Sequence, residues 1–130
     1  MKGPRNLGEL QLAILRTLWQ RGDAAVADVH AALSDRGLAL TTIATMLRKM
    51  EEKGLVAHRE NGRQFLYRAK VAPDLVQKNL VSELVTRLFD GDPLELVNHL
   101  LRQGEIDLGE LDDLRRKVAD AERKQKRERA

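Results

Sequence analysis

Apolar positions at the start of the chain recur every three or four residues, which is the spacing of one face of an α-helix. Leu7, Leu10, Ile14 and Leu18 form the first such face. Similar faces predict two more helices, and a glycine follows each of the three. The predicted ranges are 7–20, 23–36 and 41–53, with Asp23 as the N-cap of the second and Leu38-Ala39-Leu40 as an apolar linker or minimal strand.

The pattern changes from helical to strand-like after Gly54. Residues 55–59 and 65–68 are typical of two short strands, and Asn61-Gly62 between them is a strong hairpin signal. Three helices followed by a hairpin is the order of elements in a winged helix-turn-helix. The sequence therefore predicts a mostly α-helical fold with a small β-hairpin wing.

The second half of the chain returns to helical spacing, with helices predicted over 72–89, 92–102 and 107–121. Asp92 and Pro93 are a typical helix start, and Asp107 and Glu110 can cap the last helix. Beyond Ala121 the tail is almost wholly charged and is expected to fray. The predicted domains are a winged helix-turn-helix domain over 1–71, a helical dimerisation region over 72–121 and the charged tail over 122–130.

The helix predicted over 72–89 is apolar over well over half of its circumference, whereas packing on one neighbour needs a narrower stripe. We expect a second copy of the chain to bury the surplus, which would make a two-fold dimer suited to a palindromic operator. The alternative is that the last two helices cover it within one chain. The predicted dimerisation residues are Val76, Leu80, Val81, Leu84, Val85, Leu88, Phe89, Leu111 and Leu114.

Composition excludes several classes of function. The 130 residues include no cysteine, so disulfides, thiolate metal sites and cysteine nucleophiles are absent. His30, His58 and His99 lie on separate predicted elements without metal-ligand spacing, and no catalytic constellation stands out. We therefore expect no enzyme activity, no metal and no cofactor.

No apolar run is long enough to span a bilayer and no signal peptide is recognisable, so a cytoplasmic protein without membrane insertion is expected.

The net charge of +3 is weak evidence for nucleic acid, but the local distribution of charge is informative. Short polar side chains and cations share the predicted outward arc of the helix over 41–53, as a helix in the major groove requires. Arg59 and Arg63 flank the hairpin turn. The alternative is a winged-helix protein-interaction module that does not bind DNA. The predicted DNA-binding residues are Thr41, Thr42, Ala44, Thr45, Arg48, Lys49, Arg59 and Arg63.

Several motifs together resemble the penicillinase-repressor family of the BlaI/MecI/CopY type. They are Leu7-Gly8-Glu9-Leu10-Gln11, Ile14 to Trp19, Thr42-Ile43-Ala44-Thr45-Met46-Leu47, Lys53-Gly54-Leu55-Val56 and Phe65-Leu66-Tyr67. The resemblance spans about Leu7 to Val118 and is most specific over the first 70 residues. It implies a homodimeric repressor that binds palindromic promoter DNA, with the helix over 41–53 in the major groove. Genes for β-lactam resistance or another stress response are the implied targets.

The resemblance also implies a route of release. Some members are cut in the C-terminal region after a membrane sensor protease signals, and the matching position here is Asn98-His99. Those members commonly have an aromatic residue after the asparagine, and His99 departs from that pattern. The copper-responsive branch has cysteine ligands that this chain lacks. Ala44 stands where some relatives have a longer polar or basic residue, so the operator of a relative is not assumed.

Overall fold

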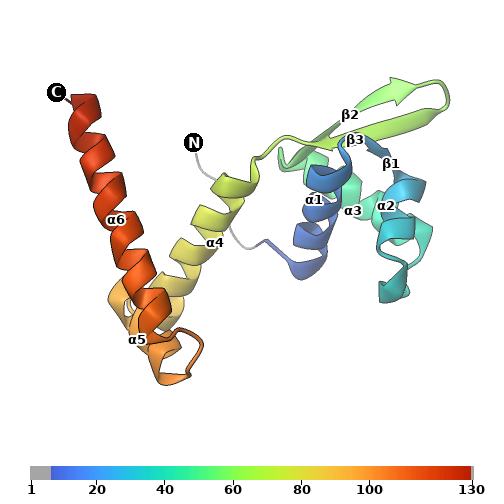
Figure 1. Cartoon of the computed structure of the whole chain (residues 1–130). Coiled ribbons are helices and arrows are strands. Elements are labelled where there is room, and N and C mark those ends of the chain that lie inside the picture. The colour runs from blue at the N-terminus through green and yellow to red at the C-terminus, as the bar shows by residue number, and fades with distance from the viewer. Residues whose placement is uncertain (1–6, 130) are drawn as a thin grey trace. The chain divides into compact units, whose positions relative to one another are not determined.

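The computed structural model describes residues 7–129 (Figure 1). Its elements are α1 (Glu9–Arg21), β1 (Ala24–Ala25), α2 (Val26–Ala32), the 3-10 helix η1 (Ser34–Arg36), α3 (Leu40–Glu52), β2 (Val56–Asn61), β3 (Gln64–Ala69), α4 (Pro73–Leu88), α5 (Pro93–Arg102) and α6 (Leu108–Arg129). The chain divides into two compact units, of which the first ends at Glu83 and the second begins at Leu84. This architecture confirms the predicted fold class, mostly α-helical with a β-hairpin wing.

The core of the first unit joins the three N-terminal helices to the sheet. Ile14 of α1, Val29 of α2 and Ile43 of α3 are each 0% exposed and belong to one apolar cluster with Val56 of β2 and Tyr67 of β3. The indole Nε1 of Trp19 donates a hydrogen bond to the carbonyl oxygen of Val71 at 2.9 Å, which ties α1 to the residues after β3. These contacts fix the orientation of α3 relative to the wing.

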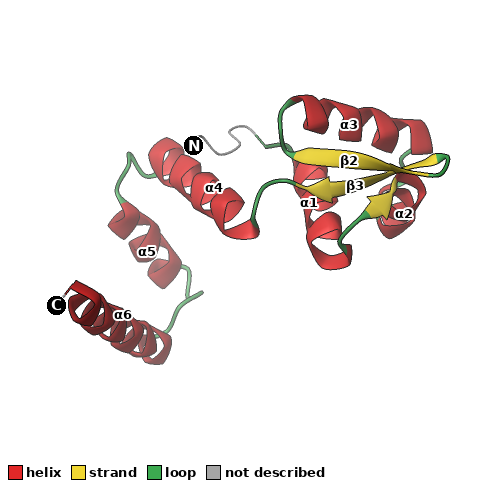
Figure 2. Ribbon diagram, turned by 90° about the horizontal axis from the view of Figure 1, so that it is seen from above, coloured by secondary structure: helices red, strands yellow, loops and turns green. Residues whose placement is uncertain are grey.

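The sheet has three antiparallel strands in the order β1-β3-β2 (Figure 2). The sequence predicted the two hairpin strands and, as one of two alternatives, a minimal strand at Leu38-Ala39-Leu40. The minimal strand is wrong, because Leu38 and Ala39 lie in a loop and Leu40 begins α3. The additional strand is Ala24–Ala25, whose residues are opposite Tyr67 and Leu66 of β3.

The start of α2 also differs from the prediction. Its N-cap is Ala25, whose backbone N–H donates to the carboxylate of Asp28 at 3.0 Å. Asp23 is not the cap, because pairing of β1 with β3 extends the backbone as far as Ala25 before the helix begins. The carboxylate of Asp23 is free to accept a hydrogen bond from the wing instead.

The hairpin turn lies one residue later than the signal suggested. Asn61 pairs with Gln64, so the two loop residues are Gly62 and Arg63. Gly62 has φ +64°, and a glycine with positive φ in the first of two loop positions is typical of a tight hairpin with the right twist. The shift places Arg63 at the tip of the wing itself.

Helix α4 begins in the first unit, where Val76 is 1% exposed and Leu80 packs against the core. One part of its broad apolar surface is therefore covered within the chain. The N-terminal caps at Asp92 and Asp107 agree with the prediction. Asp92 Oδ1 accepts a hydrogen bond from the Leu94 N–H at 3.0 Å. The side chains of Asp107 and Glu110 each accept a hydrogen bond from the backbone N–H of the other residue. Helix α6 continues through the charged segment after Ala121 to Arg129.

Candidate nucleic-acid interface

Helix α3 divides cleanly into a buried face and an exposed face. Ile43, Leu47 and Met50 are each 0% exposed, and their spacing of four and three residues places them on one side. The predicted DNA-binding positions Thr41, Thr42, Thr45, Arg48 and Lys49 are all exposed, and Ala44 is half-buried. The helix is thus anchored by its apolar side and presents hydroxyl groups and cations on the other.

The amino-terminal turn of α3 has no side-chain cap. Its N-cap is Ala39, which has no side chain able to accept a hydrogen bond from the first N–H groups. Leu40, in the first turn, is 48% exposed. Sequence reasoning assigned Leu40 to a linker and missed its place in this turn of the helix.

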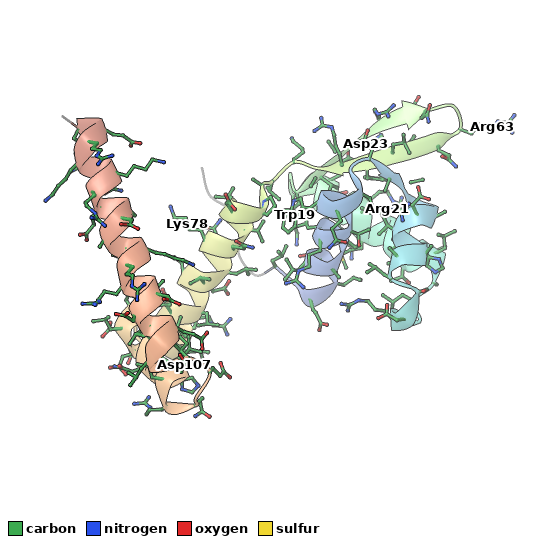
Figure 3. The ribbon with its side chains drawn as sticks, viewed as in Figure 1. Trp19, Arg21, Asp23, Arg63, Lys78 and Asp107 are labelled. Atoms are coloured by element: carbon green, nitrogen blue, oxygen red, sulfur yellow. The ribbon has the colours of Figure 1, made fainter. Side chains whose placement is uncertain are left out.

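The two predicted wing cations have different surroundings. Arg63 lies at the outer end of the hairpin (Figure 3), and within residues 7–129 the structure gives it no ion pair. Arg59 is held by Asp23, with 2.8 Å between its Nε and Oδ2 of the carboxylate. The guanidinium of Arg63 therefore has no acidic partner among the described residues, whereas that of Arg59 shares its charge with a carboxylate.

A second set of contacts joins the end of α3 to the wing. Glu51 accepts hydrogen bonds from the backbone N–H of His58 at 3.1 Å and from its ring Nδ1 at 2.7 Å. The imidazole of His58 stacks on Phe65, with 4.3 Å between ring centroids, and lies 5.5 Å from the ring of Tyr67. This set fixes the angle between the helix and the hairpin, and no spacing rule in the sequence identifies it.

Burial raises the pKa of the Tyr67 phenol above its ordinary value. The negative charge of Glu51 raises it further, while the positive charge of Arg48 acts in the opposite direction. The phenol therefore stays neutral, as suits a side chain that is 3% exposed in the core between α3 and the wing.

The predicted dimerisation residues have diverse surroundings. Val76 and Leu80 belong to the first unit's core, and Val85 is buried in the second unit. In contrast, Val81, Leu84 and Leu88 are 53%, 41% and 70% exposed. Phe89 and Leu111 are half-buried and Leu114 is 48% exposed. Three further exposed apolar side chains, absent from the predicted set, are Leu94, Leu108 and Val118.

The exposed apolar residues of α6 line an open groove of about 670 Å³. Leu108, Leu111, Leu114, Val118 and Ala119 contribute its apolar wall. Contiguous apolar surface of this kind is typical of a protein–protein contact. The groove belongs to the second unit alone.

The candidate cleavage site lies inside a helix. Asn98 and His99 are exposed residues of α5, and the carbonyl oxygen of His99 accepts from the Gln103 N–H at 3.0 Å. The ring of His99 lies 5.8 Å from that of Phe89. The side chains are accessible, but the peptide bond between them is part of a hydrogen-bonded helix.

Two further properties of residues 7–129 concern metal binding and membrane insertion. No group of three or more His, Cys, Asp or Glu side chains is placed to hold a metal ion there. No helix in this described part of the chain is long and apolar enough to cross a membrane.

A helix-turn-helix with an exposed polar third helix and a cationic hairpin defines a winged helix-turn-helix protein of the DNA-binding class. The penicillinase repressor family model matches residues 7–120, and the chain therefore belongs to the penicillinase repressor family. That family consists of transcriptional repressors and not of enzymes, so the predicted family and the predicted class, a DNA-binding repressor, are both confirmed.

The chain is similar to several individual proteins. The chain is 32% identical over 120 residues to the transcriptional regulator BlaI of Mycobacterium tuberculosis, covering 89% of this chain and 85% of that protein. Among solved structures, MepR, a transcription regulator of the Staphylococcus aureus multidrug efflux pump MepA, is 18% identical with a TM-score of 0.49. That match covers 92% of this chain and 81% of MepR. A MarR family protein from Bacillus stearothermophilus is 17% identical with a TM-score of 0.47, covering 94% and 77% of the two chains.

Proposed function

We propose that this protein is a homodimeric repressor that binds a palindromic promoter through the exposed face of α3. The observation that carries the proposal is the division of α3 into a fully buried apolar face and an exposed face with three threonines, Arg48 and Lys49. Threonine hydroxyls can hydrogen-bond base edges, and the two cations can contact phosphates or guanine. The proposed base-reading residues are Thr41, Thr42, Ala44, Thr45 and Arg48, with Lys49 on the backbone.

The wing is proposed to hold the DNA backbone beside the groove that α3 enters. Arg63 carries this role, because it is at the tip and has no acidic partner among residues 7–129. Arg59 contributes less, since Asp23 neutralises part of its charge. The contacts of Glu51 and His58 support the proposal by fixing the wing relative to α3.

The second unit is proposed to join two copies. Its exposed apolar side chains together form more apolar surface than a small region usually leaves in water without a partner. They are Leu84, Leu88, Leu108, Leu114 and Val118. A two-fold dimer would place two copies of α3 on half-sites one helical turn, or a multiple of it, apart. Val76 and Leu80 take no part in this interface, because the first unit already covers them.

Release from DNA is proposed to follow a cut between Asn98 and His99, as the family resemblance implies, after a signal from a membrane sensor protease. The helical hydrogen bond at the His99 carbonyl means that α5 must open locally before a protease can bind the peptide in extended form. Among the described residues, α5 has no fully buried side chain, so the cost of opening is small. The controlled genes are proposed to serve β-lactam resistance or another stress response.

Selection of bound sequences from random duplex DNA tests the central part of this proposal. The expected product is a palindrome with two half-sites. On that selected site, the double variant Thr45→Ala, Arg48→Ala should bind about 10- to 100-fold more weakly in a gel shift, since a good bidentate base contact contributes about 1–3 kcal/mol. Lys78→Ala, on α4, is the matched control and should bind as wild type.

The outcomes separate DNA binding from a role in protein interaction alone. Contacts with phosphates make affinity fall steeply as salt rises. Failure to enrich any sequence, together with DNA retention that does not depend on salt, would show that the winged helix does not act on DNA. Enrichment of a site to which the double variant binds unchanged would show that α3 does not read it.

A further inference from the structure

The charge of the second unit is divided sharply along its length. Residues 84–122 have a net charge of −5, whereas residues 123–129 have a net charge of +4 in only seven positions. Residues 1–83 have a net charge of +4, and the three parts together give the +3 of the whole chain. The last seven described residues of α6 therefore carry as much net positive charge as the whole first unit.

This end of α6 has no packing role within the chain. No apolar residue occurs between Glu122 and Arg129, and every side chain in that range is exposed. The apolar groove of α6 ends at Glu122. The segment thus extends the helix by two turns beyond the last residue that could enter a core or an apolar interface.

Most of the positive charges there are not neutralised. Arg123 pairs with Asp120, but the structure gives Lys124, Lys126, Arg127 and Arg129 no ion pair with any residue from 7 to 129. Further back on the same helix, Arg115 and Arg116 both bind the carboxylate of Asp112, at 2.9 and 2.8 Å. One helix therefore contains a neutralised basic stretch and an unneutralised one.

Like charges three and four residues apart on a helix repel each other, as do those of Arg123 with Lys126 and Arg127. A polyanion removes this repulsion and gains entropy from the release of its own counterions. A short run of Lys and Arg on an exposed helix is suited to such a partner.

We propose that residues 123–129 of α6 are a second DNA-binding site, which contacts the phosphate backbone without regard to base sequence. The partner is double-stranded DNA, because the chain belongs to a DNA-binding class and its residues 84–122, at −5, repel the polyanion that α3 must read. The +4 of the tail offsets most of that repulsion. The site increases the rate of encounter and the affinity for any DNA, and it leaves the choice of operator to α3. This inference rests on the proposed function only in requiring that the protein bind DNA.

The test compares two triple variants of the full chain that remove the same charge from the same helix. The tail variant is Lys124→Gln, Lys126→Gln, Arg127→Gln. The matched control is Arg115→Gln, Arg116→Gln, Lys117→Gln, which lies where Asp112 supplies an acidic partner. Glutamine is a good helix former, and circular dichroism verifies that α6 is retained in both.

Affinity is measured against salt on the selected operator and on a random duplex of equal length. The tail variant should reduce the slope of log affinity on log salt by about 0.9 for each lost phosphate contact. It should weaken binding to operator and random DNA by the same factor. The control should keep the wild-type slope.

Any result that differs from these expectations overturns the inference. An unchanged slope in the tail variant, with wild-type operator binding intact, removes the second site and leaves the proposed function standing. An equal loss of DNA affinity in both triple variants would show an effect of the net charge of the chain and not of residues 123–129. A rise in dimer dissociation at unchanged slope shows that the tail binds the acidic stretch of a second copy. Loss of binding to phosphatidylserine vesicles at unchanged slope assigns the tail to a membrane. If wild type shows no salt-dependent DNA binding, both proposals fail together.

Discussion

The two units of this protein bury their apolar residues to very different extents. In the first unit, residues from three helices and the sheet form a single core, in which Ile14, Val29, Ile43, Leu47 and Met50 are 0% exposed. From Leu84 to Arg129 the structure buries one apolar side chain, Val85, and leaves Leu88, Leu94 and Leu108 about 70–80% exposed. The first unit builds its core within one chain, whereas the second leaves several of its large apolar side chains exposed.

This difference fits the two roles that we propose for the chain. A helix that reads base edges has to be held rigidly, and a single-chain core does that for α3. A surface that pairs copies has to stay apolar and accessible until a partner covers it. Substitutions that act on one unit and spare the other can therefore test the division directly.

The largest expected effect follows Leu47→Ala in the first unit. Leu47 is 0% exposed in the core that anchors α3, and truncation of a buried leucine leaves a cavity. We expect the free energy of unfolding to fall by about 2–5 kcal/mol, measured by urea denaturation, with loss of operator binding. Thr45→Ala, on the opposite face of α3, should change stability by less than about 0.5 kcal/mol. Similar losses in both variants would contradict the division of α3 into two faces.

The next effect is expected from Leu114→Glu together with Val118→Glu in the second unit. Both side chains are about half exposed in the single chain, so the substitutions have little to disrupt there. In the proposed dimer each would place a charge in an apolar contact that contributes about 1.5–3 kcal/mol per side chain. Sedimentation should show the dimer dissociating at about 100-fold higher concentration or more. A wild-type chain that sediments as a monomer at micromolar concentration would remove the basis of the comparison.

A smaller effect distinguishes the two wing arginines. Arg63→Gln should lower the slope of log affinity on log salt by about 0.9 for each copy bound, since it removes one phosphate contact per chain. Arg59→Gln should lower it less, because Asp23 already binds that guanidinium. Salt titrations of the two variants on one operator measure the difference. The reverse order would show that Arg59 leaves Asp23 when DNA binds.

The smallest effect concerns Tyr67 and alkaline pH. Its pKa is raised in the folded protein, above the ordinary 10.0 that applies when the chain unfolds. The neutral phenol therefore stabilises the fold fully below about pH 10, and this contribution is lost as pH rises through the folded-state pKa. Denaturation curves from pH 8 to 11 should show wild type losing stability more steeply than Tyr67→Phe. Parallel curves would show that the phenol makes no such contribution.

The sequence predicted the features that follow from local periodicity and failed on those that depend on distant contacts. The buried face of α3 and the caps at Asp92 and Asp107 could be predicted, because the residues that define each of them lie within four positions of one another. Strand β1 was not, because two alanines carry no strand signal and become a strand only by pairing with Tyr67 and Leu66. The same holds for Asp23, whose partner Arg59 lies 36 residues away.

Periodicity also predicted the broad apolar surface of α4 without showing what covers each part. The positions alone gave no means to assign Val76 and Leu80 to the core of the first unit and Leu84 and Leu88 to the exposed surface of the second. That distinction depends on where the helix meets the rest of the fold. The dimerisation set that we propose therefore omits Val76 and Leu80 and adds the exposed Leu94, Leu108 and Val118.

The most direct test of the account is the number of chains bound to one selected operator, measured by sedimentation of the protein–DNA complex. The account predicts two wild-type chains per palindrome, and the Leu114→Glu, Val118→Glu variant should bind its half-sites independently and much more weakly. A single wild-type chain bound with full affinity, or a double variant that binds as tightly as wild type, would contradict the division between a unit that reads DNA and a unit that joins two copies.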